Sequence, residues 1–400
     1  MSMNSTPSSE RVHIGFFGLR NAGKSSLVNA VTGQNLAVVS EVKGTTTDPV
    51  KKAMELLPLG PVLIIDTPGI DDVGELGEMR IKKAREILAK TDIAVLVAEC
   101  GKALSTPEKE LLSEFKARSL PYIIARTKSD LAECSIKPAD DEIFVSSKSG
   151  DGIKEFKDRL AALKRPENSK KIVSDLLSPG DIAVLVIPID AAAPKGRLIL
   201  PQQQTIRDLL DNHCTAVCCQ VGELKNTLEV LGDKAKIVIT DSQAFGEVSR
   251  IVPENILLTS FSILFARYKG DLKALLKGAD KLKKLGDGDK VLISEGCTHH
   301  RQCGDIGSQK MPRWIEEFCG HKPEFSFSSG GEFPQNLKNY SLVVHCGGCM
   351  LNEAEMKHRT ALCEEQKIPI VNYGVAIAHM HGILRRSLSP FPDMQKYISD

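Results

Sequence analysis

A glycine-rich segment near the start of the chain carries the residue types that bind phosphate groups. Residues 18–25 fit the pattern G-x-x-x-x-G-K-[ST] in full. An apolar run precedes the pattern and a periodic stretch follows it, so a strand and a helix are expected to flank the loop. Backbone N–H groups of such a loop and the positive end of the helix attract phosphate. Lys24 is then expected to reach the β- and γ-phosphates of a nucleotide, and the Ser25 hydroxyl to hold Mg²⁺.

A second apolar run, over 62–65, leads into Asp66-Thr67-Pro68-Gly69. Ligand groups in open α/β sheets lie beyond the carboxyl ends of the strands. We therefore expect Asp66 to bind Mg²⁺ through water and the Gly69 N–H group to meet the γ-phosphate. The threonine-rich segment 44–48 lies between the two motifs, and one of its hydroxyls is expected to complete the Mg²⁺ shell when the loop closes on the nucleotide.

A third apolar run ends in residues that favour guanine over adenine. A carboxylate at Asp130 can accept two hydrogen bonds from the guanine edge, which adenine does not offer. The stem of Lys128 can lie over the base. A further short run ends in Ser146 and Ser147, small polar residues that could contact guanine O6. The order and spacing of these elements predict a GTP-hydrolysing P-loop domain.

The cysteines predict a second kind of chemistry further along the chain. Only two of the eleven cysteines, Cys100 and Cys134, fall in the first 170 residues. The polar N-terminus lacks the apolar stretch of a secretory signal. An odd number of cysteines without an export signal favours metal or redox chemistry over a disulfide framework.

Apolar runs over 290–296, 340–344 and 368–374 predict three strands in the last third of the chain. Two candidate ligand groups follow the first two runs, Cys297-x-His299 and His345-Cys346-x-x-Cys349. Because parallel strands direct their carboxyl ends to one crevice, the two groups are expected to converge. Three cysteines and a histidine fit a structural zinc site, and three cysteines also fit a [4Fe–4S] cluster with one exchangeable position. The residue types alone do not choose between these two, but the paired glycines between the last two cysteines favour a ligand loop over core thiols.

A chain of 400 residues is expected to form two or three domains. The polar stretch 164–171 is interpreted as a linker, and the segment after it as a small α/β unit that includes a turn and a short strand over 193–201. That unit has no catalytic signature, which is typical of an interaction module. The predicted fold class is α/β with three domains, a Ras-like P-loop GTPase domain at 1–170, a small α/β dimerisation domain at 171–265 and a C-terminal α/β cluster-binding domain with parallel strands at 266–400.

The first domain resembles the Era/TrmE branch of GTPases in its P-loop, its threonine-rich segment and its Asp66-Thr67-Pro68-Gly69 motif. The resemblance aligns Thr46 with the Mg²⁺-binding switch threonine. Members with asparagine at the position of Asn21 often use K⁺ as an activating cation. Glu78 aligns with a water-positioning glutamate of that branch, and the alternative is a solvated helix residue. Thr127 stands where the family usually has asparagine, so guanine specificity is expected to survive with weaker affinity.

These observations give a complete set of predicted GTPase residues. Catalysis is assigned to Lys24, Thr46, Gly69 and Glu78. Contacts to GTP or GDP are assigned to Gly18, Asn21, Ala22, Gly23, Lys24, Ser25, Ser26, Asp66, Thr127, Lys128, Asp130, Ser146 and Ser147. Mg²⁺ is assigned to Ser25, Thr46 and Asp66, and K⁺ to Asn21.

The whole chain is similar to the HydF family of [FeFe]-hydrogenase maturation GTPases, because Cys-x-His and His-Cys-x-x-Cys follow an Era-like GTPase domain. The resemblance implies a [4Fe–4S] cluster held by Cys297, Cys346 and Cys349, with His299 and His345 as further candidates. It also implies a scaffold that delivers a diiron precursor to apo-[FeFe]-hydrogenase, with the radical-SAM maturases as further partners. A cytoplasmic homodimer is expected.

The competing interpretation is an RNA- or ribosome-associated Era-like GTPase with a structural zinc site. A formal net charge of +1 and the lack of an RNA-binding motif count against nucleic acid as a partner. No apolar run approaches the roughly 18 residues of a membrane-spanning helix, so no membrane association is expected.

Overall fold

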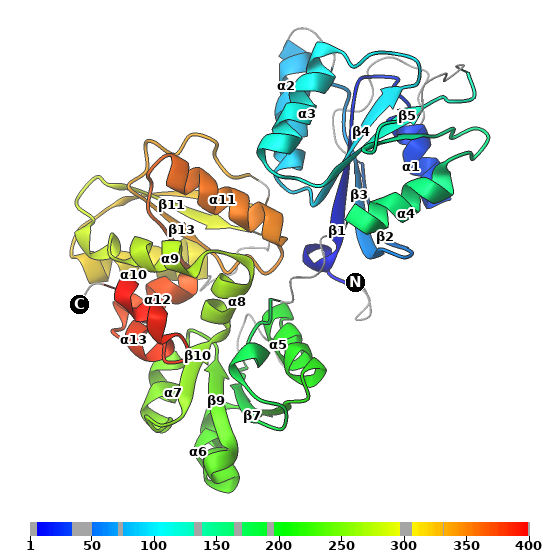
Figure 1. The fold of residues 1–400 in the computed structure, drawn as a ribbon. Coiled ribbons are helices and arrows are strands. Elements are labelled where there is room, and N and C mark those ends of the chain that lie inside the picture. Colours follow the sequence, from blue (N-terminus) through cyan, green and yellow to red (C-terminus); the bar gives the residue numbers. More distant parts are fainter. Residues whose placement is uncertain are drawn as a thin grey trace. The chain divides into compact units, whose positions relative to one another are not determined.

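The computed structural model describes residues 6–33, 50–70, 75–131, 138–163, 170–189, 196–296, 306–330 and 332–398, without the side chains of 75–79. The chain divides into two compact units, Met1–Asn168 and Ser169–Asp400. Figure 1 shows that helices and strands alternate along both units. The predicted α/β class is confirmed.

The first unit is built on one sheet with strand order β2-β3-β1-β4-β5-β6, in which only the β2–β3 pairing is antiparallel. Its strands are β1 (Val12–Phe17), β2 (Val50–Leu56), β3 (Gly60–Asp66), β4 (Ile93–Glu99), β5 (Tyr122–Thr127) and β6 (Glu142–Phe144). Its helices are α1 (Lys24–Thr32), α2 (Glu75–Leu88), α3 (Thr106–Ala117) and α4 (Ile153–Leu163).

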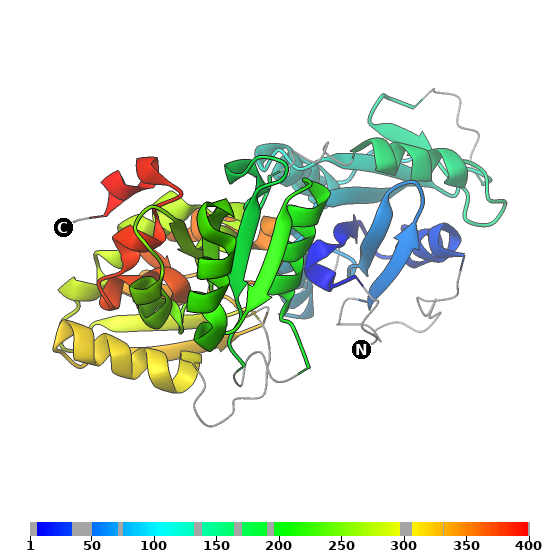
Figure 2. The same cartoon turned by 90° about the horizontal axis from the view of Figure 1, so that it is seen from below.

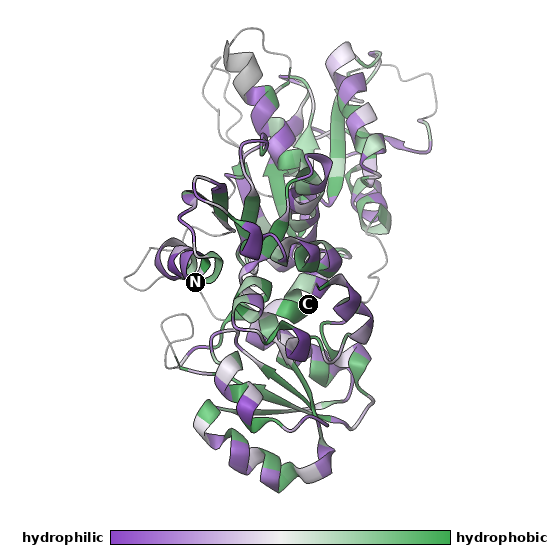
Figure 3. Ribbon diagram, turned by 90° about the vertical axis from the view of Figure 1, so that its left-hand side faces the viewer, coloured by the Kyte–Doolittle hydropathy of each residue, from purple (hydrophilic) through white to green (hydrophobic). Residues whose placement is uncertain are grey.

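Each face of this sheet is covered by two helices, because the central strands β1, β3, β4 and β5 are apolar on both sides. Side chains of α1 and α4 form one buried cluster, whereas those of α2 and α3 form another. In Figure 3 many strands are coloured mostly hydrophobic, and the helices carry both colours. The carboxyl ends of β1 and β3 are therefore left for the P-loop and for Asp66.

The second unit contains two sheets of four strands each, and neighbouring strands in both sheets are parallel. The first has order β10-β9-β7-β8, from β7 (Ile182–Val186), β8 (Thr215–Cys219), β9 (Ala235–Thr240) and β10 (Leu257–Ser260). The second has order β12-β11-β13-β14, from β11 (Lys290–Glu295), β12 (Glu324–Ser329), β13 (Leu342–His345) and β14 (Ile370–Asn372). Figure 2 shows helices beside these strands as well.

The helices of this unit are α5 (Leu200–Asp211), α6 (Leu224–Leu231), α7 (Phe245–Ile251), α8 (Phe261–Lys269), α9 (Leu272–Ala279), α10 (Met311–Cys319), α11 (Glu353–Glu365), α12 (Tyr373–Met380) and α13 (Leu384–Ser387). One buried cluster runs through both sheets and includes Ile237 of β9 and Leu292 of β11. Helix α8 contributes Leu264 and Phe265 to it, so the predicted division at 265/266 falls inside a helix.

One local prediction in this unit is wrong, and one strand was not predicted. Residues 198–200 form no strand, because Ile199 caps helix α5 and Pro201 occupies the first turn, where a missing N–H group costs nothing. Strand β12 was not predicted, since its Glu-Phe-Ser-Phe-Ser-Ser sequence alternates at a sheet edge and lacks a continuous apolar run.

Helix α9 packs its Gly278 directly on the backbone of β14. A Cβ atom added at Gly278 would lie 1.9 Å from the carbonyl oxygen of Ile370. We predict that Gly278→Ala lowers the free energy of unfolding by about 1–3 kcal/mol, as overpacking does. Urea unfolding measures the change. Gly246→Ala in α7 is the control, because nothing lies within 4 Å of its added Cβ; a Gly278 variant as stable as this control would contradict the prediction.

Candidate functional site

The P-loop connects β1 to α1 and holds the lysine of the motif in a buried position. Lys24 is 7% exposed, and its Nζ donates to the carbonyl oxygens of Gly18 at 3.1 Å and Leu19 at 2.7 Å. Asn21 has a left-handed φ of 59° and an exposed side chain. The loop thus places a cation beneath a turn of main-chain N–H groups, which is an arrangement that suits phosphate.

Asp66 at the end of β3 meets the first helical turn after the P-loop. The Ser25 hydroxyl donates to its Oδ2 at 2.6 Å, whereas its buried Oδ1 has no hydrogen-bond partner among the described residues. Burial raises the pKa of Asp66, and the Ser25 hydrogen bond and the Lys24 charge act in the opposite direction. An orphaned carboxylate oxygen beside a serine hydroxyl is the oxygen donor set that Mg²⁺ prefers, so these residues fit the predicted ion.

The Asp66-Thr67-Pro68-Gly69 motif also touches the P-loop directly. The Thr67 hydroxyl donates to the carbonyl oxygen of Phe16 at 2.7 Å. A Cβ atom added at Gly69 would lie 2.8 Å from the Arg20 nitrogen, so only glycine allows this approach. Thr67 was not predicted from sequence, since its role depends on the neighbouring strand β1.

Thr127 replaces the usual asparagine and still braces the P-loop. It is 2% exposed, and its hydroxyl lies 2.5 Å from the Ala22 carbonyl oxygen and 3.2 Å from that of Ala98. The hydroxyl group of Thr127 can therefore donate its one proton to the carbonyl oxygen of Ala22 in the P-loop. The position keeps its link to the loop, at the carbonyl of Ala22.

The predicted guanine-binding residues lie together at the ends of β5 and β6. The Ser146 hydroxyl donates to Asp130 Oδ1 at 2.8 Å, which fixes the orientation of the carboxylate. Lys128 has a left-handed φ of 59°, and its Nζ lies 3.4 Å from Glu99 Oε1. The structure therefore brings Asp130, Lys128 and Ser146 to one end of the sheet. Thr46 lies outside the described residues, as does the side chain of Glu78.

In the second unit, β11 and β13 are adjacent and parallel, with Ser294 opposite His345. Their carboxyl ends meet, because the Gly296 N–H group donates to Cys346 Sγ at 3.0 Å and the Gly348 N–H group lies 3.4 Å from the same sulfur. Two main-chain donors aimed at one sulfur favour its thiolate. Cys297 and His299 lie outside the described residues, and within the described part of the chain no group of three metal-ligating side chains occurs.

His345 is fully buried, and both of its ring nitrogens are engaged. Nδ1 lies 2.7 Å from the Cys346 carbonyl oxygen and Nε2 lies 2.9 Å from an Arg359 nitrogen. Burial, together with the Arg359 charge, lowers the pKa of His345 to about 3, so the ring is neutral. Its Nδ1–H group therefore donates to the carbonyl oxygen of Cys346, and its Nε2 accepts a hydrogen bond from Arg359. Binding a metal ion would require His345 to give up one of these bonds.

The cysteines divide into several environments. Cys346 and Cys349 are partly buried in the loop after β13, and Cys363 is buried in the core, where burial raises its thiol pKa to about 12. Cys218 is exposed on the edge strand β8. Cys100 is disulfide-bonded, which departs from the expectation for this composition.

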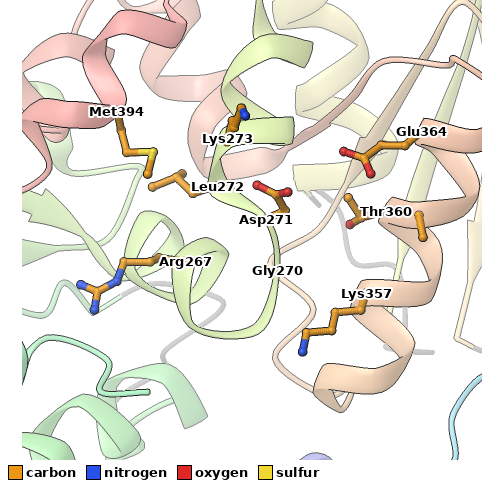
Figure 4. Close-up of a pocket in the computed structure, with 10 residues that line it drawn as sticks. Arg267, Gly270, Asp271, Leu272, Lys273, Lys357, Thr360, Glu364 and Met394 are labelled. Carbon is orange, nitrogen blue, oxygen red and sulfur yellow. The ribbon is translucent and has the colours of Figure 1, made fainter. Parts of the chain in front are cut away.

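A cavity of about 360 Å³ lies between the α8–α9 turn and α11 (Figure 4). Two cations in its lining already have carboxylate partners, since Arg267 pairs with Asp175 and Lys357 with Glu353. The lining also includes Asp271, Lys273 and Glu364, so charges of both signs surround the cavity. Within the described residues, no helix is both long and apolar enough to cross a membrane.

Comparison with known proteins agrees with this division. Residues 13–128 match the family described as 50S ribosome-binding GTPase. Residues 172–270 match the Hydrogen maturase F dimerization domain, and residues 273–390 match the Hydrogen maturase F tetramerization domain. The chain belongs to the hydrogen maturase F family. The first unit is a P-loop GTPase domain, and the second consists of the two oligomerization domains of this family.

Curated relatives resemble the GTPase domain. The tRNA modification GTPase MnmE of Nitratidesulfovibrio vulgaris is 34% identical over 141 residues, which cover 34% of this chain and 30% of the relative. MnmE of Rhizobium meliloti is 35% identical over 148 residues, covering 37% and 31%. This hydrogen maturase F chain thus spans about a third of the length of the curated relatives that it matches.

Solved structures show weaker likeness. Era of Aquifex aeolicus bound to GDP and AlF4⁻ is 16% identical, with 55% of this chain and 98% of that chain covered and a TM-score of 0.33. The G domain of the T. maritima FeoB iron transporter is 23% identical, with coverages of 39% and 100% and a TM-score of 0.31.

The hydroxyl of Thr127 gives a testable contribution to nucleotide affinity. We predict that Thr127→Val weakens GDP binding about fivefold, because losing one hydrogen bond to the P-loop costs about 1 kcal/mol. Titration of fluorescent GDP measures the change. Thr127→Ser keeps the hydroxyl and is expected to bind like wild type, and equal affinities in all three proteins would contradict the predicted brace.

The raised pKa of Asp66 predicts that this carboxylate lowers the stability of the nucleotide-free protein while GTP hydrolysis requires it. Above that pKa the buried carboxylate is charged and costs stability, and the cost disappears as the pH falls through it. Without nucleotide, Asp66→Asn is therefore expected to exceed wild type in stability at pH 7, with the difference shrinking toward pH 4, while GTP hydrolysis is lost. Urea unfolding across this range tests the sign. The exposed Asp158→Asn serves as control, and a destabilised Asp66 variant would refute the prediction.

Proposed function

We propose that this chain is a GTP-hydrolysing scaffold that carries a [4Fe–4S] cluster and delivers a diiron precursor to apo-[FeFe]-hydrogenase. The observation that carries the proposal is the environment of the Cys346 sulfur. This sulfur accepts a hydrogen bond from the N–H group of Gly296, which follows β11, and lies 3.4 Å from the N–H group of Gly348, in the loop after β13. Membership of the hydrogen maturase F family supports apo-[FeFe]-hydrogenase as the protein that receives the precursor. The radical-SAM maturases, a homodimeric or higher assembly and a cytoplasmic location belong to the same proposal.

In this proposal the cluster is held by Cys297, Cys346 and Cys349. The fourth position is exchangeable, with His299 or His345 as candidates for it. A [4Fe–4S] cluster in such a site supplies a redox-active, anionic group with one labile coordination position. The hydrogen bonds to Cys346 Sγ fit a thiolate at that end of the loop.

The GTPase domain acts as a switch in the same proposal. Lys24 and the P-loop N–H groups hold the phosphates, Ser25 and Asp66 hold Mg²⁺, and Asp130 selects guanine. Thr46 and Gly69 respond to the γ-phosphate, Glu78 positions the attacking water, and Asn21 contributes to a K⁺ site. Nucleotide state then gates cluster transfer or partner release, as γ-phosphate contacts do in other switches.

Anaerobic purification tests the cluster directly. We expect a brown wild-type protein with about four iron atoms per chain, and a loss of iron in Cys346→Ser and in Cys349→Ser. Cys319→Ser is the matched control, because Cys319 lies in helix α10. It is therefore outside the ligand loop, which is the segment 346–349 that follows β13. A colourless wild-type protein with one zinc ion would overturn the proposal in favour of an Era-like GTPase with a structural zinc site.

A further inference from the structure

A lysine is buried beneath the loop that carries the last two cysteines. Lys269 is the final residue of helix α8 and is 4% exposed. Its Nζ donates to the carbonyl oxygens of Cys349 and Leu351, each at 3.2 Å. Because burying an ammonium group is costly unless it is hydrogen-bonded, these two carbonyls are part of what holds the lysine in place.

The contact joins two segments of the second unit. Lys269 lies in the part that matches the dimerization domain, whereas Cys349 and Leu351 lie in the part that matches the tetramerization domain. The other end of the ligand loop is held separately, because His345 donates to the carbonyl oxygen of Cys346. Each end of Cys-x-x-Cys is thus fixed through the carbonyl of its own cysteine.

The same lysine influences the second cysteine electrostatically. The ammonium group is held against the Cys349 carbonyl oxygen, so its positive charge lies beside this residue. A buried positive charge in that position favours added negative charge on anything that the Cys349 sulfur binds. The geometry therefore gives Lys269 both a mechanical and an electrostatic relation to the ligand loop.

We propose that Lys269 is a positioning residue of the cluster site, which holds the Cys349 end of the loop and stabilises the reduced cluster through its charge. The inference rests on the proposed function, because it requires the cluster. Reduction adds negative charge to an iron–sulfur cluster, so a buried cation beside a ligand raises its reduction potential. Loss of the two carbonyl bonds loosens the loop and speeds cluster loss.

The test compares Lys269→Met with wild type in the full-length, reconstituted protein. Cluster loss to a chelator is followed by absorbance, and the midpoint potential by redox titration with EPR detection. We expect about tenfold faster loss, as for other residues that support metal ligands, and a more negative potential. GTP hydrolysis is expected to stay at the wild-type rate. Lys273→Met is the matched control, because Lys273 is exposed on helix α9 four positions further along.

The outcomes separate this inference from the proposed function. If Lys269→Met contains iron but loses its cluster at the wild-type rate and has the wild-type midpoint potential, the inference about Lys269 is overturned and the proposed function is not. If wild type takes up no cluster, the proposed function fails and the inference fails with it. Should Lys269→Met not fold, Lys269→Gln keeps a donor without the charge, and a potential equal to wild type in that variant also overturns the proposal.

Discussion

The ligand loop of the second unit depends on the full burial of one guanidinium group. Arg359 of helix α11 is 1% exposed, and a charge in that position must be hydrogen-bonded on several sides. It contacts Glu355, the carbonyl oxygen of Gly330, the Ser294 hydroxyl and His345 Nε2. Because Arg359 can only donate, His345 must accept at Nε2 and carry its proton on Nδ1, which then donates to Cys346. A charge buried beneath the sheet thus fixes the direction of the first residue of the ligand loop.

This network explains how β11 and β13 act together. Ser294 and His345 lie opposite each other in the parallel pair, and both contact Arg359. The strands therefore end in register, which brings the Gly296 N–H group to the Cys346 sulfur. Removing Arg359 would leave Glu355 as a buried charge without this partner, so the network is costly to break even where replacing it entirely would cost little.

The sequence was sufficient for features that depend on local pattern and on sheet topology. The P-loop, Asp66 and the convergence of strand ends at Cys346 follow from strand–loop–helix order and from parallel pairing. Features that depend on side chains meeting across the fold were not accessible, because neither burial nor partners can be inferred from spacing. The sequence therefore indicates His345 only as a ligand candidate, and it makes no prediction for Lys269 or for the hydrogen-bond partners of Thr127. Thr46, Cys297 and His299 lie outside the described residues and stay predictions.

The P-loop and the ligand loop share one electrostatic arrangement. In each, a glycine-containing loop follows a parallel strand, and the main-chain N–H groups of such a loop suit an anion. A buried lysine lies behind each loop and donates to its carbonyls, Lys24 to Gly18 and Leu19, and Lys269 to Cys349 and Leu351. The formal net charge of +1 does not reveal these two buried lysines. Each acts at a single site, where the low dielectric constant of the interior strengthens its interaction with a nearby anion. Phosphate and the proposed thiolate-bound cluster are chemically different ligands, but both are anionic, and behind each loop the fold places a buried lysine.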